Sequence, residues 1–199
     1  MFTVKDYSSF VEHPRFGRKP RLTGLHPLET PDGSVVFHWH SGPKVRVMNT
    51  AVAADLTKQR PATIPVTHYF DAKRICRRCE RPFLFFAEEQ KYWYEELRFP
   101  LEADCLECVL CRKSEQRLDT ARRKYERLLA RSDRAEDDTL SMVECAVLLI
   151  ESSVFSKKLI PKLRGFLKPA LSAPDAPGST RAKALLSRIN NVERREGSP

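Results

Sequence analysis

Cysteine spacing is the feature that most constrains what this chain can fold into. Five of its six cysteines lie between positions 76 and 111, and the first two form the motif Cys76-Arg-Arg-Cys79. Two intervening residues let both sulfurs reach one tetrahedral ion at about 2.3 Å, and a second pair after a hairpin and a short helix is typical of zinc ribbons and treble clefs. The sequence therefore predicts one structural Zn²⁺ bound by four thiolates.

Two overlapping pairs can complete this site, because Cys105-Leu-Glu-Cys108 and Cys108-Val-Leu-Cys111 share one cysteine. A helix is expected to begin almost at once after Cys111, and the free N–H groups and dipole of a helix N-terminus favour thiolate. We therefore expect Cys76, Cys79, Cys108 and Cys111 to be the ligands, with Cys105 as the alternative to Cys111.

The residues between the two cysteine pairs predict a small module with a strand and a helix. Residues 83–86 favour a strand, and residues 88–97 favour a short helix that carries Tyr92, Trp93 and Tyr94. We expect these three rings to belong to a core. The alternative is an exposed stacking platform for nucleobases, which needs at least two of the rings to face solvent. Because such a module rarely holds a core alone, zinc is expected to supply much of its folding free energy.

One known family shares the pattern of this module. The shared parts are Cys76-Arg-Arg-Cys-Glu-Arg-Pro-Phe-Leu-Phe-Phe-Ala-Glu-Glu-Gln90, then Tyr92-Trp-Tyr94, then Phe99, and finally Cys108-Val-Leu-Cys-Arg-Lys113. With these parts the chain resembles the bacterial family described as a probable zinc-ribbon domain, over about residues 73–113. The resemblance implies a zinc-binding domain, and it brings no biochemical activity with it.

The chain as a whole predicts the α+β class, a treble-clef-like zinc-ribbon module between an extended N-terminal segment and a C-terminal α-helical region. Residues 34–48 favour a β-hairpin with His38 and His40 on its polar face. The expected divisions are a proline-rich extended segment at 1–72, the zinc-ribbon module at 73–113, helices at 114–169, a linker at 170–180 and a terminal helix at 181–195.

Apolar periodicity and capping residues predict the helices of the C-terminal region. A second helix is expected at about 138–152, apolar on both sides, with Cys145 as a small core residue. Ser156 is expected to cap a third helix that Pro169 ends, and Thr180 to cap the last one. The first helix of the region carries an apolar stripe at Leu118, Ala121, Tyr125, Leu128 and Leu129.

The net charge of +9 is distributed along the chain, and one short segment is densely basic. Residues 114–134 carry seven basic and four acidic side chains, whereas the rest of the chain is more evenly balanced. Five cations form a stripe beside the apolar one on the same helix, and two arginines lie in the first cysteine pair. This arrangement predicts a nucleic-acid or ribonucleoprotein partner. The residues concerned are Arg77, Arg78, Lys113, Arg117, Lys124, Arg127 and Arg131.

A different class of function competes with this one. The helices that follow the cysteine module favour a zinc-stabilised protein–protein interaction or scaffold module, because a zinc ribbon that binds nucleic acid does not need them. A stable protein partner that resists nuclease would decide for this alternative.

Other function classes are disfavoured by the sequence. It contains no phosphate-binding glycine loop and no nucleophile elbow, and four thiolates close the coordination shell that a catalytic zinc keeps open. We therefore expect no enzyme and no small-molecule substrate, with thiol redox chemistry as the enzymatic alternative. The longest apolar run, Cys145 to Ile150, is far shorter than the roughly 20 residues of a membrane span. With no apolar N-terminal stretch, we expect no membrane partner and a cytoplasmic location.

Overall fold

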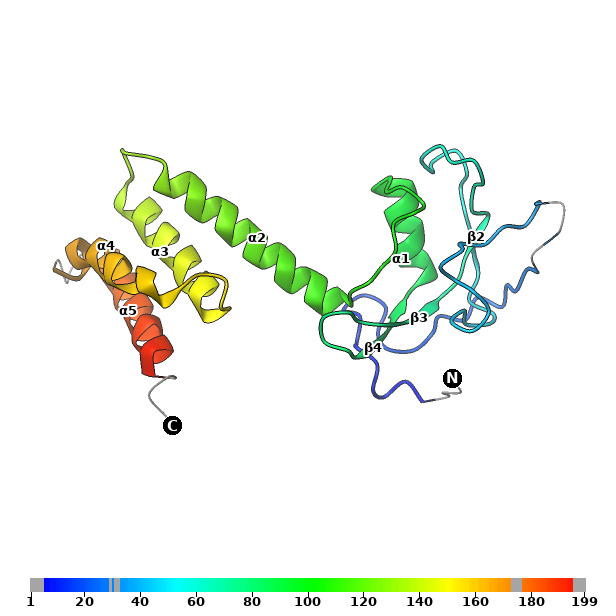
Figure 1. Ribbon diagram of the computed structural model, residues 1–199, viewed down its shortest axis with the longest axis horizontal. Coiled ribbons are helices and arrows are strands. Elements are labelled where there is room, and N and C mark those ends of the chain that lie inside the picture. The colour runs from blue at the N-terminus through cyan, green and yellow to red at the C-terminus, as the bar shows by residue number, and fades with distance from the viewer. Residues whose placement is uncertain (1–5, 29, 31–32, 173–176, 195–199) are drawn as a thin grey trace. The chain divides into compact units, whose positions relative to one another are not determined.

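The computed structural model describes residues 6–28, 30, 33–172 and 177–194 and divides the chain into two compact units, Met1–Lys113 and Ser114–Pro199. Figure 1 shows strands in the first unit and packed helices in the second, which confirms the predicted α+β class. The elements of the first unit are β1 (Val52–Ala53), β2 (His68–Tyr69), β3 (Ala72–Ile75), β4 (Pro82–Phe85), α1 (Ala87–Lys91) and a π-helical turn (Tyr92–Glu96).

The strands of the first unit form two antiparallel pairs, β1 with β2 and β3 with β4. Successive side chains of a strand point to opposite faces, and both faces of β4 are buried. Phe83 and Phe85 pack in one cluster with the buried cysteines. Leu84 packs with Phe86 and with Phe10 of the N-terminal segment. The Phe-Leu-Phe-Phe run therefore joins the cysteine site to the segment that precedes it in the sequence.

The predicted hairpin at 34–48 is wrong. Phe37 forms an isolated parallel bridge with His68, and Arg46 forms an antiparallel bridge with Ala72. Each half of the expected hairpin thus pairs with a later part of the chain instead of with its other half. The reason is that β2 and β3 are short strands with unpaired edges, whose N–H and C=O groups must be satisfied by some neighbour.

A buried carboxylate holds the N-terminal segment onto the module. Asp71 lies between β2 and β3 and accepts hydrogen bonds from the N–H groups of Arg21 (2.8 Å) and Ala87 (2.7 Å). Burial raises the pKa of Asp71 to about 6, although both N–H donors act to lower it. Because these donors come from positions far apart in the sequence, one side chain ties three segments together.

The second unit consists of helices around one apolar core. Helix α2 begins at Val109, slightly earlier than predicted, and the boundary between the units falls inside it. Figure 1 shows α3, α4 and α5 side by side, and no described helix is long and apolar enough to cross a membrane. The bounds are α2 (Val109–Leu129), α3 (Glu136–Glu151), a 3-10 turn (Lys157–Leu159), α4 (Ile160–Ser172) and α5 (Ser179–Arg194).

Two predicted helix ends in this unit are wrong. Pro169 lies inside α4, because burial of Leu167 and Ala170 on either side outweighs the roughly 3 kcal/mol that an internal proline costs a helix. Helix α5 begins at Ser179, so Thr180 is not its cap. The expected linker at 170–180 is therefore helical at both ends, and its residues 173–176 lie outside the described part of the chain. Ser156 does cap the 3-10 turn, accepting from the Lys158 N–H.

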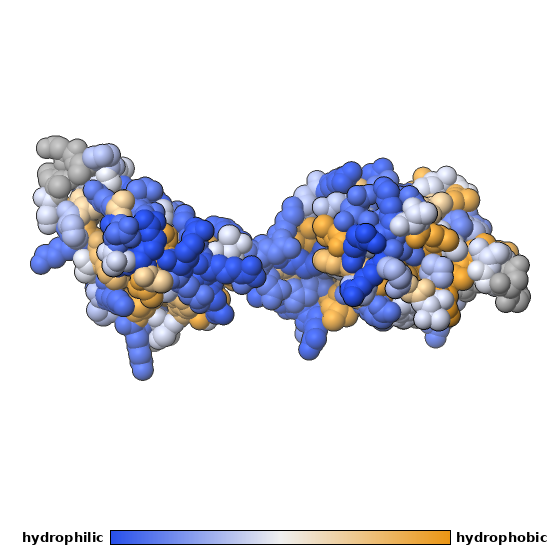
Figure 2. Space-filling view, turned by 90° about the horizontal axis from the view of Figure 1, so that it is seen from above, coloured by the Kyte–Doolittle hydropathy of each residue, from blue (hydrophilic) through white to orange (hydrophobic). Residues whose placement is uncertain are grey.

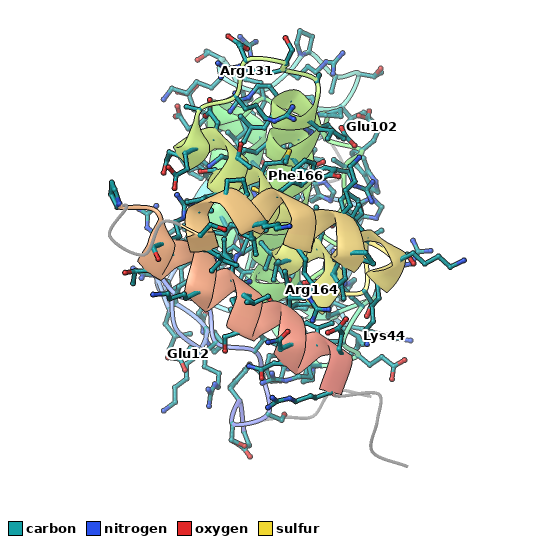
Figure 3. The ribbon with its side chains drawn as sticks, turned by 90° about the vertical axis from the view of Figure 1, so that its left-hand side faces the viewer. Glu12, Lys44, Glu102, Arg131, Arg164 and Phe166 are labelled. Carbon is teal, nitrogen blue, oxygen red and sulfur yellow. The ribbon has the colours of Figure 1, made fainter. Side chains whose placement is uncertain are left out.

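Ion pairs between helices neutralise two of the four basic side chains of α5. Arg181 donates to Glu144 and Arg188 to Glu151, both acceptors lying on α3. On α4, Arg164 reaches Glu193 of α5 at 2.6 Å (Figure 3). Figure 2 shows hydrophilic residues over most of the visible surface of each unit, with smaller apolar areas between them.

Candidate metal centre

Four sulfur atoms meet at one point of the first unit. The Sγ atoms of Cys76, Cys79, Cys108 and Cys111 all lie within 4.8 Å of one another, and those of Cys79 and Cys108 are 3.9 Å apart. A tetrahedron with metal–sulfur bonds of 2.3 Å has edges of about 3.8 Å. Among the described residues this is the one group of three or more suitable donors, and its spacing fits a tetrahedral metal ion such as zinc.

The first cysteine pair forms a tight turn at the end of β3. The Glu80 N–H donates to the Cys76 carbonyl oxygen at 2.9 Å, and the Cys76 N–H donates to the Arg81 carbonyl oxygen at 3.0 Å. Glu80 has a φ of +58°, in the left-handed region that costs a non-glycine residue about 1 kcal/mol. The β3–β4 pairing that follows holds this conformation in place.

The second pair stands at the start of α2, where the helix dipole favours negative charge. The Cys108 N–H points at the Cys76 Sγ, 3.3 Å away. Burial would raise the pKa of Cys76, but the N–H groups of Cys108, Cys79 and Arg78 outweigh it and bring the value to about 6. Burial and the neighbouring sulfurs raise the pKa values of Cys108 and Cys111. Binding of a metal at neutral pH must therefore release protons from the site.

Cys105 lies outside the four-sulfur group. Its thiol donates to the Glu107 carbonyl oxygen at 3.3 Å, and burial raises its pKa to about 12. A buried, protonated thiol with its own acceptor is a poor ligand. The structure thus brings Cys111 to the site and gives Cys105 a packing role beside Phe83 and Phe85.

An ion pair that the sequence pattern does not reveal supports the start of α2. The Arg112 guanidinium donates to Glu89 Oε1 on α1 at 2.5 Å and to the Glu107 carbonyl oxygen at 3.0 Å. It also lies over the Trp93 ring, 4.8 Å from its centroid. His13 Nε2 is 3.7 Å from the same carboxylate. Burial acts to raise the pKa of Glu89, but the hydrogen bond from His13 and the positive charge of Arg112 hold it below its usual value. The residue after Cys111 is thereby fixed against α1.

Comparison with known families shows what this module is. Residues 70–119 match the family model described as a probable treble clef domain. This segment is a treble clef domain. The match confirms the resemblance seen in the cysteine pairs and extends beyond 73–113 at both ends. No curated protein and no solved structure matches the chain.

The aromatic residues of the treble clef domain are mostly buried. Tyr94 is 1% exposed and Trp93 is half-buried against Phe85 and Phe99, so that Tyr92 alone of the predicted trio is well exposed, at 50%. A stacking platform built from these three rings is therefore excluded by the criterion of two solvent-facing rings.

The expected polar strand face at His38 and His40 is also wrong. His38 is 3% exposed, and its Nε2 lies 2.6 Å from the Leu101 carbonyl oxygen, while Nδ1 accepts from the His40 N–H. With both ring nitrogens engaged, His38 is a neutral core residue. His40 stays at the surface, where its Nδ1 is 3.8 Å from Asp104.

Mild acid is expected to destabilise the first unit through His38. Burial lowers the pKa of this ring from 6.5 to about 4. Between these two pH values His38 is therefore protonated in the unfolded chain and neutral in the folded protein. The penalty is absent above pH 6.5 and grows as the pH falls from 6.5 toward 4, to about 2 kcal/mol at pH 5. Urea unfolding at pH 7 and pH 5 measures it. The His38→Gln variant should lose less stability between these two pH values, and an equal loss would contradict the prediction.

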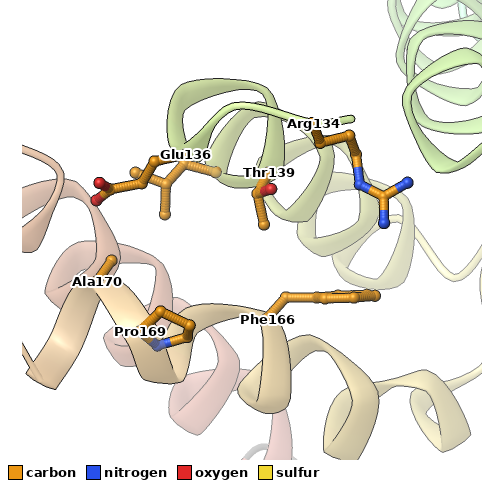
Figure 4. Close-up of a pocket in the computed structure, with 7 residues that line it drawn as sticks. Arg134, Glu136, Thr139, Phe166, Pro169 and Ala170 are labelled. Carbon is orange, nitrogen blue, oxygen red and sulfur yellow. The ribbon is translucent and has the colours of Figure 1, made fainter. Parts of the chain in front are cut away.

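A pocket in the second unit offers no site for chemistry. It encloses about 220 Å³ among residues of α3 and α4, with Phe166 on one side and Thr139 and Arg134 on the other (Figure 4). Cavities that bind small molecules are usually larger than about 300 Å³. The Arg134 guanidinium already donates to the carbonyl oxygens of Leu128 and Leu129 at the end of α2.

Cys145 is a buried core residue of the second unit, as expected.

Proposed function

We propose that this protein is a non-catalytic, cytoplasmic zinc protein that binds nucleic acid or ribonucleoprotein along α2. Four clustered thiolates would fill the coordination shell of one Zn²⁺ and leave no position for a substrate. The ion then has a structural role, which is to fix the treble clef domain and the start of α2. Reduced cysteines of this kind persist in the cytoplasm.

The observation that carries the proposal is a line of unneutralised cations on α2. Lys113, Arg117, Lys124 and Arg127 recur at intervals of three, four or seven residues, which places them on one flank of the helix. All are exposed, and in the described part of the chain none has an acidic partner. We call these four residues the basic stripe. They span about 20 Å of helix at 1.5 Å per residue.

Two other arginines of α2 are neutralised by carboxylates, which distinguishes them from the basic stripe. Arg131, predicted to belong to it, pairs with Asp138 at 3.0 Å and with Asp133 at 3.5 Å near the α2–α3 loop (Figure 3). Arg123, on another side of α2, pairs with Asp119 at 2.6 Å. Phosphate groups would supply the counter-charges that the stripe lacks.

The first cysteine pair adds two cations of its own. Arg77 and Arg78 are exposed in the turn between Cys76 and Cys79, and no described side chain neutralises them. The Arg77 N–H donates to the Leu106 carbonyl oxygen at 2.9 Å, which joins the two halves of the metal site. Their guanidinium groups are therefore free for phosphate, on a backbone that the metal would hold.

Salt dependence tests the proposal. Binding of mixed-sequence nucleic acid should weaken as salt rises, with a log–log slope near −3 or −4 if each stripe cation meets one phosphate. In the Arg117→Ala/Lys124→Ala/Arg127→Ala variant the slope should become less negative by about 1 for each cation removed. Fluorescence anisotropy over a range of salt concentrations measures both values.

A matched variant controls for net charge. Lys158, Lys168 and Lys183 are also exposed on the second unit, and replacing all three by alanine removes the same charge without touching the stripe. This control should keep the wild-type slope. Equal slopes for the two triple variants would show that binding depends on total charge and not on the basic stripe. If the wild-type protein did not bind nucleic acid at low salt, the proposal would be refuted.

A protein partner is the second candidate, supported by apolar side chains on the first unit. Leu22, Leu25 and Met48 are 74%, 43% and 57% exposed. They lie on neighbouring segments, since the Thr23 N–H donates to the Asn49 carbonyl oxygen at 2.8 Å. Exposed apolar groups of this kind often mark protein interfaces. Co-purification of one stoichiometric partner after nuclease treatment would favour this candidate.

A further inference from the structure

Four aromatic rings in the first unit form a continuous column. Tyr69 stacks on Tyr94 with ring centroids 5.8 Å apart, Tyr94 on His38 at 5.2 Å, and His38 on Trp39 at 4.7 Å. The interplanar angles are all 22° or 23°, so the rings are nearly parallel. The first three rings are at most 3% exposed, whereas Trp39 is 51% exposed. The column therefore begins in the core and ends in an indole at the surface.

The terminal indole is held in one orientation. Its Nε1–H donates to His40 Nε2 at 3.1 Å, and His40 Nδ1 lies 3.8 Å from Asp104. Asp104 is in turn fixed by Arg74 at 3.1 Å. Since His38 covers one face of the Trp39 ring, the large exposed fraction of this side chain belongs mainly to its other face and outer edge. An aromatic side chain held rigidly in this way loses little entropy when it binds a ligand.

Polar groups lie beside the indole. His40 Nε2, which accepts from the indole N–H, lies 3.4 Å from the Glu102 carbonyl oxygen. The Asp104 carboxylate lies on the other side of the same imidazole. These groups offer hydrogen-bonding atoms to a planar polar ring that stacks on the indole.

These features distinguish between two ligands that stack on tryptophan. A methylated ammonium group is usually enclosed by several aromatic faces, and here one indole is exposed at the end of the column. A nucleobase needs a single flat face and polar groups at its edge, and each stacked base contributes about 1–3 kcal/mol. The site has the second set of properties.

We propose that Trp39 is a stacking site for an unpaired nucleobase of a single-stranded nucleic acid. The proposal rests on the proposed nucleic-acid function and narrows it, because stacking requires a base that is not in a duplex, whereas the basic stripe contacts phosphate alone. The four-ring column supplies the rigid support for the ring that binds the base.

Fluorescence titration of the zinc-loaded full chain tests this inference. Trp39 and Trp93 are the two tryptophans of the chain, so a Trp93→Phe background leaves Trp39 as the single reporter. The probes are a short oligothymidylate and an abasic oligomer of equal length, which carries the same phosphates without bases. We expect the oligothymidylate to quench Trp39 emission and to bind more tightly than the abasic oligomer.

Variants at the surface provide the controls. Trp39→Ala should bind the oligothymidylate between about 5-fold and 100-fold more weakly and should lose the distinction from the abasic oligomer. Trp39→Phe should retain part of the affinity, and Tyr92→Ala, which removes an exposed ring elsewhere on the unit, should retain all of it. Equal binding of the two oligomers by wild type, or unchanged binding by Trp39→Ala, would overturn the inference.

A parallel titration with duplex separates this inference from the function on which it rests. Salt-sensitive binding of duplex together with equal binding of the two single-stranded probes would leave the basic stripe standing and refute the stacking site. If duplex and both oligomers fail to bind at low salt, the nucleic-acid function itself is refuted, and the stacking site with it.

Discussion

A Cys108→Ser variant is expected to purify without zinc and with its treble clef domain unfolded. Cys108 provides one of four sulfurs in the site, and its N–H also points at the Cys76 sulfur. Structural zinc sites contribute on the order of 10 kcal/mol to the folding of small domains, so the loss of one ligand exceeds the stability of the domain. Elemental analysis of the purified protein and circular dichroism measure the two effects.

Cys105→Ser is the matched control for this variant. Cys105 is as buried as Cys108, but its thiol donates to a carbonyl oxygen outside the four-sulfur group, and a serine hydroxyl can make the same bond. This variant should keep one zinc per chain, whereas Cys111→Ser should lose it. If Cys108→Ser retained stoichiometric zinc, the four-sulfur site would be wrong. If Cys105→Ser lost the metal and Cys111→Ser retained it, the ligand would be Cys105.

Removal of the Glu89 carboxylate is expected to cost about 3 kcal/mol of stability. The Glu89→Ala variant leaves the Arg112 guanidinium, whose side chain is 21% exposed, next to the metal site with no carboxylate to neutralise it. Breaking one half of a buried ion pair is costly because the remaining charge has lost its water as well as its partner. Urea unfolding at constant zinc concentration measures the loss.

An exposed pair on the same helix provides the comparison. Arg123 and Asp119 are 2.6 Å apart, close to the separation in the buried pair, but their side chains are 79% and 50% exposed. Asp119→Ala should therefore cost less than about 0.5 kcal/mol. A double variant, Glu89→Leu/Arg112→Met, should recover much of the loss, since apolar residues leave no buried charge. Equal effects of Glu89→Ala and Asp119→Ala would contradict this account of Arg112.

Local spacing in the sequence was sufficient to predict the treble clef domain. The two residues between Cys76 and Cys79 set how far apart their sulfurs can lie, and the run of residues 83–86 sets the strand that follows. Both patterns depend on neighbours within a few positions, where covalent geometry decides the outcome. Local patterns also predicted the helices of the second unit. The periodicity of their apolar residues indicated that each helix exists, but it did not fix the residues at which the helices begin and end.

Long-range pairing explains the features that could not be predicted. The segment containing Phe37 and Arg46 alternates like a hairpin, yet its partners lie in residues 68–72, and no local signal names them. Glu89 and Arg112 are 23 positions apart and become partners only when α1 and α2 are in place. His38 was interpreted as a surface residue because its acceptor, the Leu101 carbonyl oxygen, lies 63 positions later. In each case contacts between distant parts of the chain decided the structure, and the local sequence pattern did not indicate them.

The separation of the two cysteine pairs along the chain has a consequence for how the domain assembles. The first pair belongs to a turn between adjacent strands and needs only local contacts, while Cys108 arrives 29 positions after Cys79. Closing a loop of that length costs about 3 kcal/mol in chain entropy before any contact is gained. A metal ion captured first by Cys76 and Cys79 offsets this cost when the second pair docks. The β3–β4 hairpin would then form first, the metal ion would bind to Cys76 and Cys79 next, and the start of α2 would dock last. The rate of this last step would depend on how fast the connecting chain brings Cys108 and Cys111 to the two open coordination positions of the ion.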